Sequence, residues 1–147
     1  DMAAIAGFVH PVTGLRFSPS AFVQDTDRVY TPEALRSAFS DNTIVQWGIG
    51  EGSGLQLEYT FSDYYDQFVY SQDFVNAPQM GYNNQLVSGS TTYNIAEYYP
   101  GAVFVEFHFP GFDPKYEGLD WESLSLVFQV VEGQWYLVGI VHSAWTP

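Results

Sequence analysis

The sequence predicts an α+β domain in which a curved antiparallel sheet packs against two or three helices. Three observations support this fold class. Residues 103–142 alternate apolar and polar side chains in three stretches, residues 31–39 and 60–69 carry helix start signals followed by apolar residues at helical spacing, and residues 43–59 have the pattern of a short hairpin.

Residues 1–30 are predicted to form extended segments and turns that pack on a domain made by residues 31–147. Pro11, Gly14 and Pro19 interrupt short apolar pieces in this region. A helix is then expected from Thr31, whose side chain can cap it, with Pro32 in the first turn, where its missing N–H costs nothing. Its buried side is expected to consist of Ala34, Leu35, Ala38 and Phe39.

A second helix is predicted to begin after Thr60, because Thr60 and Asp63 have the spacing of a capping box. Its buried side is expected to be mostly aromatic, with Phe61, Tyr64, Tyr65, Phe68 and Val69. Before it, two short strands at residues 43–48 and 55–59 flank a glycine-rich turn. After it, we expect a strand at residues 82–88 and one helical turn at residues 95–99.

The last third of the chain predicts a three-stranded meander with a defined register. Glu132 and Gly133 suit a two-residue turn with positive φ, which places Val131 opposite Gln134. Regular pairing from this turn places Ser123 opposite His142 and Ser125 opposite Ile140, and the connection at 110–120 is expected to leave His108 opposite Ser123. The apolar face of the meander is then predicted to be Phe107, Leu126, Phe128, Trp135, Leu137 and Val141.

The composition argues against several classes of partner. Seventeen acidic residues against four basic ones give a net charge of −13, so nucleic acid and anionic membrane surfaces are not expected partners. With 18% aromatic and only 14% charged residues, the chain is predicted to fold rather than to be disordered. There is no cysteine, no apolar run of membrane-spanning length, and no basic start typical of a signal peptide. Few lysines, many tyrosines and an acidic balance favour an extracellular or cell-surface location.

The predicted order of helix, hairpin, helix and meander over residues 31–145, together with the closing residues 133–140, resembles the NTF2-like (SnoaL-like) superfamily of cone-shaped α+β domains. Four short sequence stretches also resemble an uncharacterised family of secreted or lipid-anchored proteins of Gram-positive bacteria. They are residues 8–11, 16–19, 107–111 and 141–146. The first resemblance implies a cone with a pocket on the concave face of its sheet. The second implies a location and no activity.

The polar face of the meander offers the candidate catalytic residues His108, His142 and Glu106. Either histidine can serve as a general base, and two imidazoles with a carboxylate can hold a divalent metal. The simpler interpretation is that this face lies on the outside, where it is solvated or covered by the N-terminal residues or by a second subunit. In the resembling superfamily, the pocket opens on the opposite, apolar face, which favours the simpler interpretation.

An aromatic-lined cavity between helix and sheet is the second candidate, and it can hold an apolar or sugar-like ligand. Ordinary core packing is the alternative for the same residues. Those named for the cavity are Tyr64, Tyr65, Phe68, Tyr82, Tyr98 and Tyr99, with Tyr93 beside them.

The acidic groups Asp25 with Asp27, and Asp113 with Glu117 and Asp120, have enough oxygen atoms to suggest calcium, although neither has EF-hand spacing. Ordinary solvated loops are the alternative. Trp145 is a candidate for a surface or dimer contact. Neither a cofactor nor a specific metal site is predicted.

The leading prediction is a secreted or surface-displayed, non-catalytic binding domain. The first alternative is a small-molecule hydrolase or isomerase that uses His108 or His142 with Glu106, and the second is a structural module that dimerises through its sheet face. These interpretations differ in which face of the sheet is covered and in whether the histidines line an enclosed cavity.

Overall fold

The computed structural model describes residues 1–86 and 92–145. Its strands are β1 (Leu15–Ser18), β2 (Arg28–Tyr30), β3 (Val45–Ile49), β4 (Gln56–Tyr59), β5 (Gln79–Tyr82), β6 (Val103–Phe109), β7 (Glu122–Val131) and β8 (Gln134–Ala144). Its helical segments are α1 (Met2–Ala6), α2 (Pro32–Ser37), η1 (Ala38–Ser40), α3 (Phe61–Tyr64), η2 (Tyr65–Val69), η3 (Phe74–Asn76), α4 (Ile95–Tyr98) and η4 (Pro114–Tyr116).

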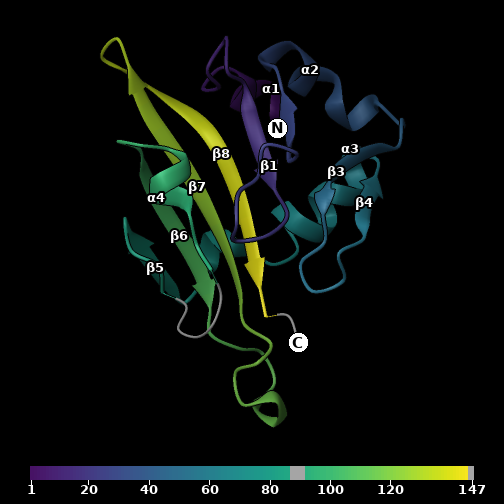
Figure 1. Ribbon diagram of the computed structural model, residues 1–147, viewed down its shortest axis with the longest axis vertical. Helices are drawn as coiled ribbons and strands as arrows, with labels where there is room; N and C mark the ends of the chain where they lie inside the picture. The colour runs from purple at the N-terminus through teal and green to yellow at the C-terminus, as the bar shows by residue number, and fades with distance from the viewer. Residues whose placement is uncertain (87–91, 146–147) are drawn as a thin grey trace.

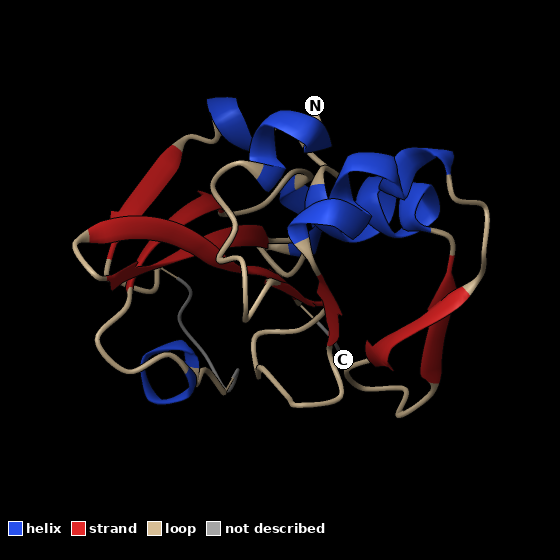
Figure 2. Cartoon of the chain, turned by 90° about the horizontal axis from the view of Figure 1, so that it is seen from above, coloured by secondary structure: helices blue, strands red, loops and turns tan. Residues whose placement is uncertain are grey.

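The main sheet has six strands in the order β2-β1-β8-β7-β6-β5 (Figure 1). All neighbouring strands in it run antiparallel except β1 and β8, which are parallel. The helices α1, α2 and α3 gather on one side of the sheet, and the short α4 lies on the other (Figure 2). The predicted α+β class with a curved, mostly antiparallel sheet is therefore confirmed.

The N-terminal residues contribute directly to the sheet. β1 lies between β2 and β8, with Phe17 opposite Ile140. Val9 forms a further bridge to Leu137, and both Met2 and Val9 are buried in the core. Pairing β1 with β8 in parallel joins segments more than a hundred residues apart, and no local pattern in the sequence signals such a contact.

Both predicted helix starts are confirmed. The Thr31 hydroxyl accepts from the N–H of Ala34, and Thr60 accepts from the N–H of Asp63 at 3.2 Å while donating to its carboxylate at 2.8 Å. The second helix ends after one turn, and the π-helical segment η2 continues it. In the first helix, half of the predicted buried side is wrong: Leu35 and Ala38 are buried, but Ala34 and Phe39 are exposed.

The predicted hairpin forms a separate two-stranded sheet of β3 and β4. The strand predicted at residues 82–88 lies earlier in the chain, as β5, and residues 87 and 88 are outside the described residues. The helical turn predicted at residues 95–99 is confirmed as α4.

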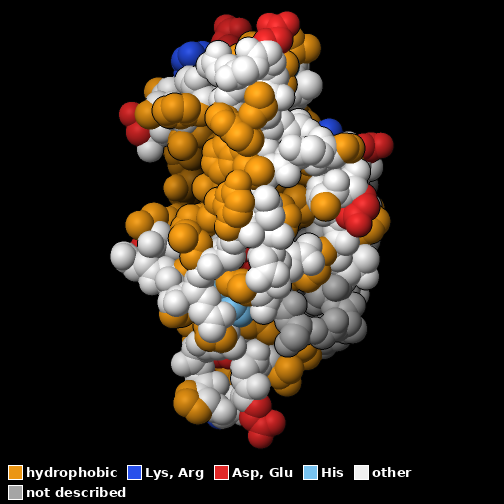
Figure 3. Space-filling model, turned by 90° about the vertical axis from the view of Figure 1, so that its left-hand side faces the viewer, with side chains coloured by type: hydrophobic (Ala, Val, Ile, Leu, Met, Phe, Trp, Pro, Cys, Tyr) orange, Lys and Arg blue, Asp and Glu red, His pale blue; other side chains and the backbone are white. Residues whose placement is uncertain are grey.

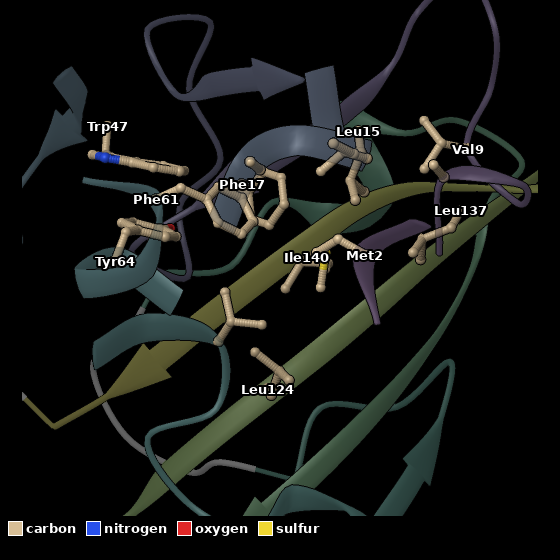
Figure 4. Packing of buried hydrophobic residues seen from close by; sticks show 14 of the residues in the cluster. Met2, Val9, Leu15, Phe17, Trp47, Phe61, Tyr64, Leu124, Leu137 and Ile140 are labelled. Atoms are coloured by element: carbon tan, nitrogen blue, oxygen red, sulfur yellow. The ribbon is translucent and has the colours of Figure 1, made fainter. Parts of the chain in front are cut away.

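The main core lies between the sheet and the helices α1–α3, and an aromatic cluster occupies one end of it (Figure 4). The rings of Trp47 and Tyr64 stack with centroids 3.8 Å apart and planes 7° apart. Phe17, from β1, meets the rings of Trp47, Phe61 and Tyr64 edge-on. This one side chain therefore links the sheet, the hairpin β3–β4 and the helix α3.

The other face of the main sheet is also covered. A second cluster joins Ile95 and Tyr99 from the α4 region and Val23 from the β1–β2 connection to Phe104 and Val127 of the sheet. Asn94 ties this cover together, because its side chain accepts from the N–H of Val23 and donates to the carbonyl of the same residue. The outer face of the sheet was predicted to be covered by N-terminal residues. Val23 does contribute to this cover, together with residues of the α4 region.

The meander has the predicted turn but a different register beyond it. Val131 pairs with Gln134, and both turn residues have positive φ, as predicted. His108 also lies opposite Ser123, as predicted. The register then shifts by one residue between Val127 and Phe128, where β8 carries an extra residue.

This bulge makes part of the predicted register wrong. Ser123 pairs with Ser143 instead of His142, and Ser125 pairs with Val141 instead of Ile140. Ile140 and His142 therefore share the main-core face with Leu124, while Val141 belongs to the cluster on the opposite face. The prediction that Trp135 lies in the core is also wrong, since this residue is 52% exposed near the hairpin tip.

We expect Phe17→Ala to lower the free energy of unfolding by about 3–5 kcal/mol, because it removes a fully buried ring from the centre of the aromatic cluster. Urea unfolding monitored by tryptophan fluorescence measures this loss. Phe8→Ala is the matched control, since Phe8 is 64% exposed and should cost less than about 1 kcal/mol. Equal losses in the two variants would contradict the role given to Phe17.

Candidate functional site

His108 lies on β6 and faces the outer layer, where it is only 5% exposed. Its Nδ1 is 2.6 Å from the hydroxyl oxygen of Ser123 on β7, and the ring of Trp121 lies nearby. Burial lowers the pKa of His108, because a charged imidazolium loses hydration there. The histidine is thus part of a packed layer and does not line any of the pockets described below.

Glu106 lies two residues earlier on the same face and is completely buried. Its Oε2 accepts a 2.8 Å hydrogen bond from the backbone N–H of Leu86, while Oε1 has no hydrogen-bond partner among the described residues. Burial raises the pKa of Glu106, although the N–H of Leu86 and the nearby Ser123 partly oppose this rise. Burial therefore shifts the equilibrium of this carboxyl group toward its neutral form.

His142 lies on the opposite face of the sheet because of the bulge in β8. Its Nε2 is 2.9 Å from Oε1 of Glu122, and its Nδ1 is 3.4 Å from the carbonyl oxygen of Pro19. The ring of Phe68 meets the imidazole edge-on. Ser71 also donates a hydrogen bond to the Glu122 carboxylate. His142 is therefore held between a strand, a π-helical segment and the β1–β2 connection.

Glu122, the partner of His142, is not among the candidate residues predicted from the sequence. Burial alone would raise its pKa, but the hydrogen bonds from His142 and Ser71 outweigh burial and lower it. The sequence did hold a sign of this contact. Glu122 lies two residues before Leu124, so it shares the core face of β7, and a carboxylate near the core needs a hydrogen-bond partner. That partner became visible only with the shifted register of β8.

The three candidate catalytic residues therefore do not meet. His108 and Glu106 share the outer face, whereas His142 faces the main core. Within residues 1–86 and 92–145, no group of three or more His, Asp or Glu side chains is placed to hold a metal ion. The arrangement provides one buried polar layer and one separate histidine–carboxylate pair.

The aromatic residues proposed for a cavity lie in three different places. Tyr64, on α3, belongs to the main core, and Tyr65 and Phe68, on η2, pack against it. Tyr82 is 66% exposed on the edge strand β5. Tyr98 and Tyr99 lie at α4 on the outer face, and Tyr93 there is 3.4 Å from the Ser143 hydroxyl.

An apolar pocket of about 240 Å³ lies between the helical segments and the core face of the sheet. Of the aromatic residues proposed for a cavity, Tyr65 is the one that lines it. The lining residues are Met2, Ile5, Tyr65, Val69, Tyr70, Phe74, Val75, Phe107, Leu124, Leu126, Leu137 and Ile140. None of these side chains carries a charge.

The core face of the sheet continues beyond this pocket as an exposed apolar surface. Met80 and Tyr82 on β5 lie opposite Phe107 and Val105 of β6, and both are more than 60% exposed. Figure 3 shows hydrophobic side chains gathered over the upper half of this side of the molecule, with a hollow beside them. The exposed apolar surface therefore adjoins the pocket at Phe107, which lines the pocket and pairs with Met80.

The acidic loops are held by their own backbone. Asp120 accepts from the N–H groups of Phe112 and Asp113, and the buried Asp27 accepts from the N–H of Gln24. Trp145 is 43% exposed. In the described residues, no helix has both the length and the apolar character needed to cross a membrane.

We expect Glu106→Gln to stabilise the protein relative to the wild type as the pH rises. The pKa of Glu106 is higher in the folded chain than its ordinary value of 4.5, so the unfolded chain ionises first and the wild type loses stability between these two values. Glutamine keeps the acceptor for Leu86 without this loss. Urea unfolding from pH 4 to pH 8 measures the difference, and a constant offset across that range would contradict it.

Glu122→Gln should show the opposite pH dependence. The folded pKa of Glu122 lies below 4.5, so its stabilising contribution is present above that value and is lost as the pH falls through the folded pKa. At pH 7 the variant should lose about 1.5–3 kcal/mol, the range for hydrogen bonds to a charged group. This loss of stability should become smaller as the pH falls below the folded pKa of Glu122. Glu58→Gln, at an exposed position of β4, is the control for both glutamine variants.

No protein-family model, curated protein or solved structure matches this chain.

Proposed function

We propose that the protein is a non-catalytic binding domain that holds a small apolar ligand in the pocket between α1, η2, η3 and the sheet. The observation that carries this proposal is the uncharged, almost entirely hydrocarbon lining of a 240 Å³ pocket. Ligand pockets are mostly apolar concave spaces with a few polar groups, and typical volumes for drug-sized ligands begin near 300 Å³. A slim or small ligand suits the observed volume.

The lining favours an apolar ligand over a sugar. A sugar needs hydrogen-bond partners for its hydroxyl groups, since a buried polar group without a partner is costly. Tyr65 and Tyr70 supply the only side-chain hydroxyls in the pocket lining, and the hydroxyl of Tyr70 already donates to Asp73 at 2.6 Å. The pocket walls instead offer aliphatic carbon and aromatic faces.

The positions of the titratable groups support binding without catalysis. His108 and Glu106 lie across the sheet from this pocket, and His142 is paired with Glu122 outside its lining. The lining of the apolar pocket contains no histidine, carboxylate or lysine to act as general acid or base. The hydrolase or isomerase alternative therefore has less support than binding.

The proposal includes the location and the finer fold class expected from the sequence. We infer an NTF2-like cone, supported by the pocket between the helices and the core face of a curved sheet. The N-terminal hairpin β1–β2 at the sheet edge and the separate sheet β3–β4 would be features of this chain. Secretion or surface display is supported by the acidic, tyrosine-rich composition.

Val75→Asp tests the binding proposal. Val75 lines the pocket and is 75% exposed, so a carboxylate there should weaken binding of an apolar ligand while leaving the fold intact. With the neutral fluorescent probe N-phenyl-1-naphthylamine, we expect the dissociation constant to rise about tenfold, which corresponds to about 1.4 kcal/mol.

Val12→Asp is the matched control, because Val12 is 84% exposed and does not line the pocket. It adds the same charge and should leave probe affinity within about twofold of the wild type. Equal weakening in the two variants, or no probe binding by the wild type, would refute the pocket. Light scattering over the same concentrations reports whether the exposed sheet face instead joins two copies of the chain.

A further inference from the structure

A second pocket, of about 230 Å³, lies at the other end of the core face, and none of its lining residues lines the apolar pocket. The turn between β3 and β4 forms one side of it, and the end of β8 forms the other. Its lining residues are Pro19, Gly50, Glu51, Ser53, Leu57, Phe68, His142 and Ala144.

In this pocket, two hydrogen-bond acceptors lie next to each other: Nδ1 of His142 and the carbonyl oxygen of Pro19. Glu122 accepts from Nε2 of His142, so in the neutral ring the proton is on Nε2 and Nδ1 carries a lone pair. The carbonyl oxygen of Pro19 lies 3.4 Å from Nδ1, which is longer than a good N–H···O hydrogen bond. A donor group that enters the pocket can serve both atoms.

The charge of the pocket favours a cation. Glu51 lies in the lining, and no lysine or arginine is among the lining residues. Glu51 is exposed on the turn between β3 and β4, where an incoming cation can reach its carboxylate. The net charge of −13 also draws cations toward the molecule.

The remaining walls are apolar. Phe68 offers an aromatic ring, and Leu57, Pro19 and Ala144 offer aliphatic surface. A carboxylate, an aromatic ring and two adjacent acceptors suit an organic cation, because a ring face attracts ammonium groups and the aliphatic wall accepts the carbon chain. We propose that this pocket binds a small organic ammonium ion of the primary alkylamine class.

A metal ion fits the same residues less well. His142 and Glu51 are the only histidine and acidic side chains in the lining, and the described residues contain no group of three such ligands. An alkylammonium ion needs fewer ligands than a metal ion and gains from the apolar wall. This distinction makes the carbon chain part of the recognition.

The test is a titration of the ¹⁵N-labelled chain with butylammonium chloride at pH 7.5 and constant ionic strength, followed by amide chemical shifts. We expect saturable shifts at Gly50, Ser53 and Ala144. Glu51→Gln should weaken binding about two- to fivefold, as expected for loss of a charge pair with an exposed carboxylate. Phe68→Leu should weaken it about two- to fivefold through loss of the ring face.

Glu58→Gln is the matched control, because it removes the same charge from the same hairpin outside the pocket and should change affinity less than twofold. Sodium chloride and 1-butanol at equal concentrations should give no saturable shifts at these amides. The proposal is overturned if the wild type shows no saturation, if the two glutamine variants weaken equally, or if 1-butanol binds as well as butylammonium.

Discussion

The central constraint on this structure is that β8 is buried on both faces. Every residue from Leu137 to Ser143 is buried, with β1 on one side of the strand and β7 on the other. One face belongs to the main core and the other to the cluster under α4. Because successive side chains of a strand point to opposite faces, a shift of one residue exchanges the two environments.

The bulge at the Val127–Phe128 step determines which environment each side chain of β8 enters. Gly139 lies at this irregularity, and a β-carbon there would come within 2.8 Å of the Tyr99 hydroxyl oxygen. The glycine thus allows the α4 region to approach the strand closely. Both faces of β8 carry apolar side chains, so alternation alone could not reveal the shift; the glycine inside an apolar strand was the available sign.

Local signals predicted local structure well. The caps at Thr31 and Thr60 and the positive-φ turn at Glu132 follow from side-chain chemistry within four residues, and all are observed. The parallel contact of β1 with β8 depends on distant segments, and only the fold brings them together. The alternating pattern of β6 and β7 was enough to predict His108 opposite Ser123. The hydrogen bond of His142 with Glu122 depends on the bulge in β8, so it was not predicted.

The bulge also explains why the two histidines of the meander have different roles. Without the extra residue, the turn at Glu132 would place His142 opposite Ser123, on the same face as His108 and Glu106. With it, Glu106 and His108 remain in a buried polar layer, and His142 reaches Glu122 and the second pocket. On the same face of β8, Leu137 and Ile140 line the apolar pocket. One inserted residue therefore places the two histidines apart, with His108 in a buried polar layer on one face and His142 in the second pocket on the other.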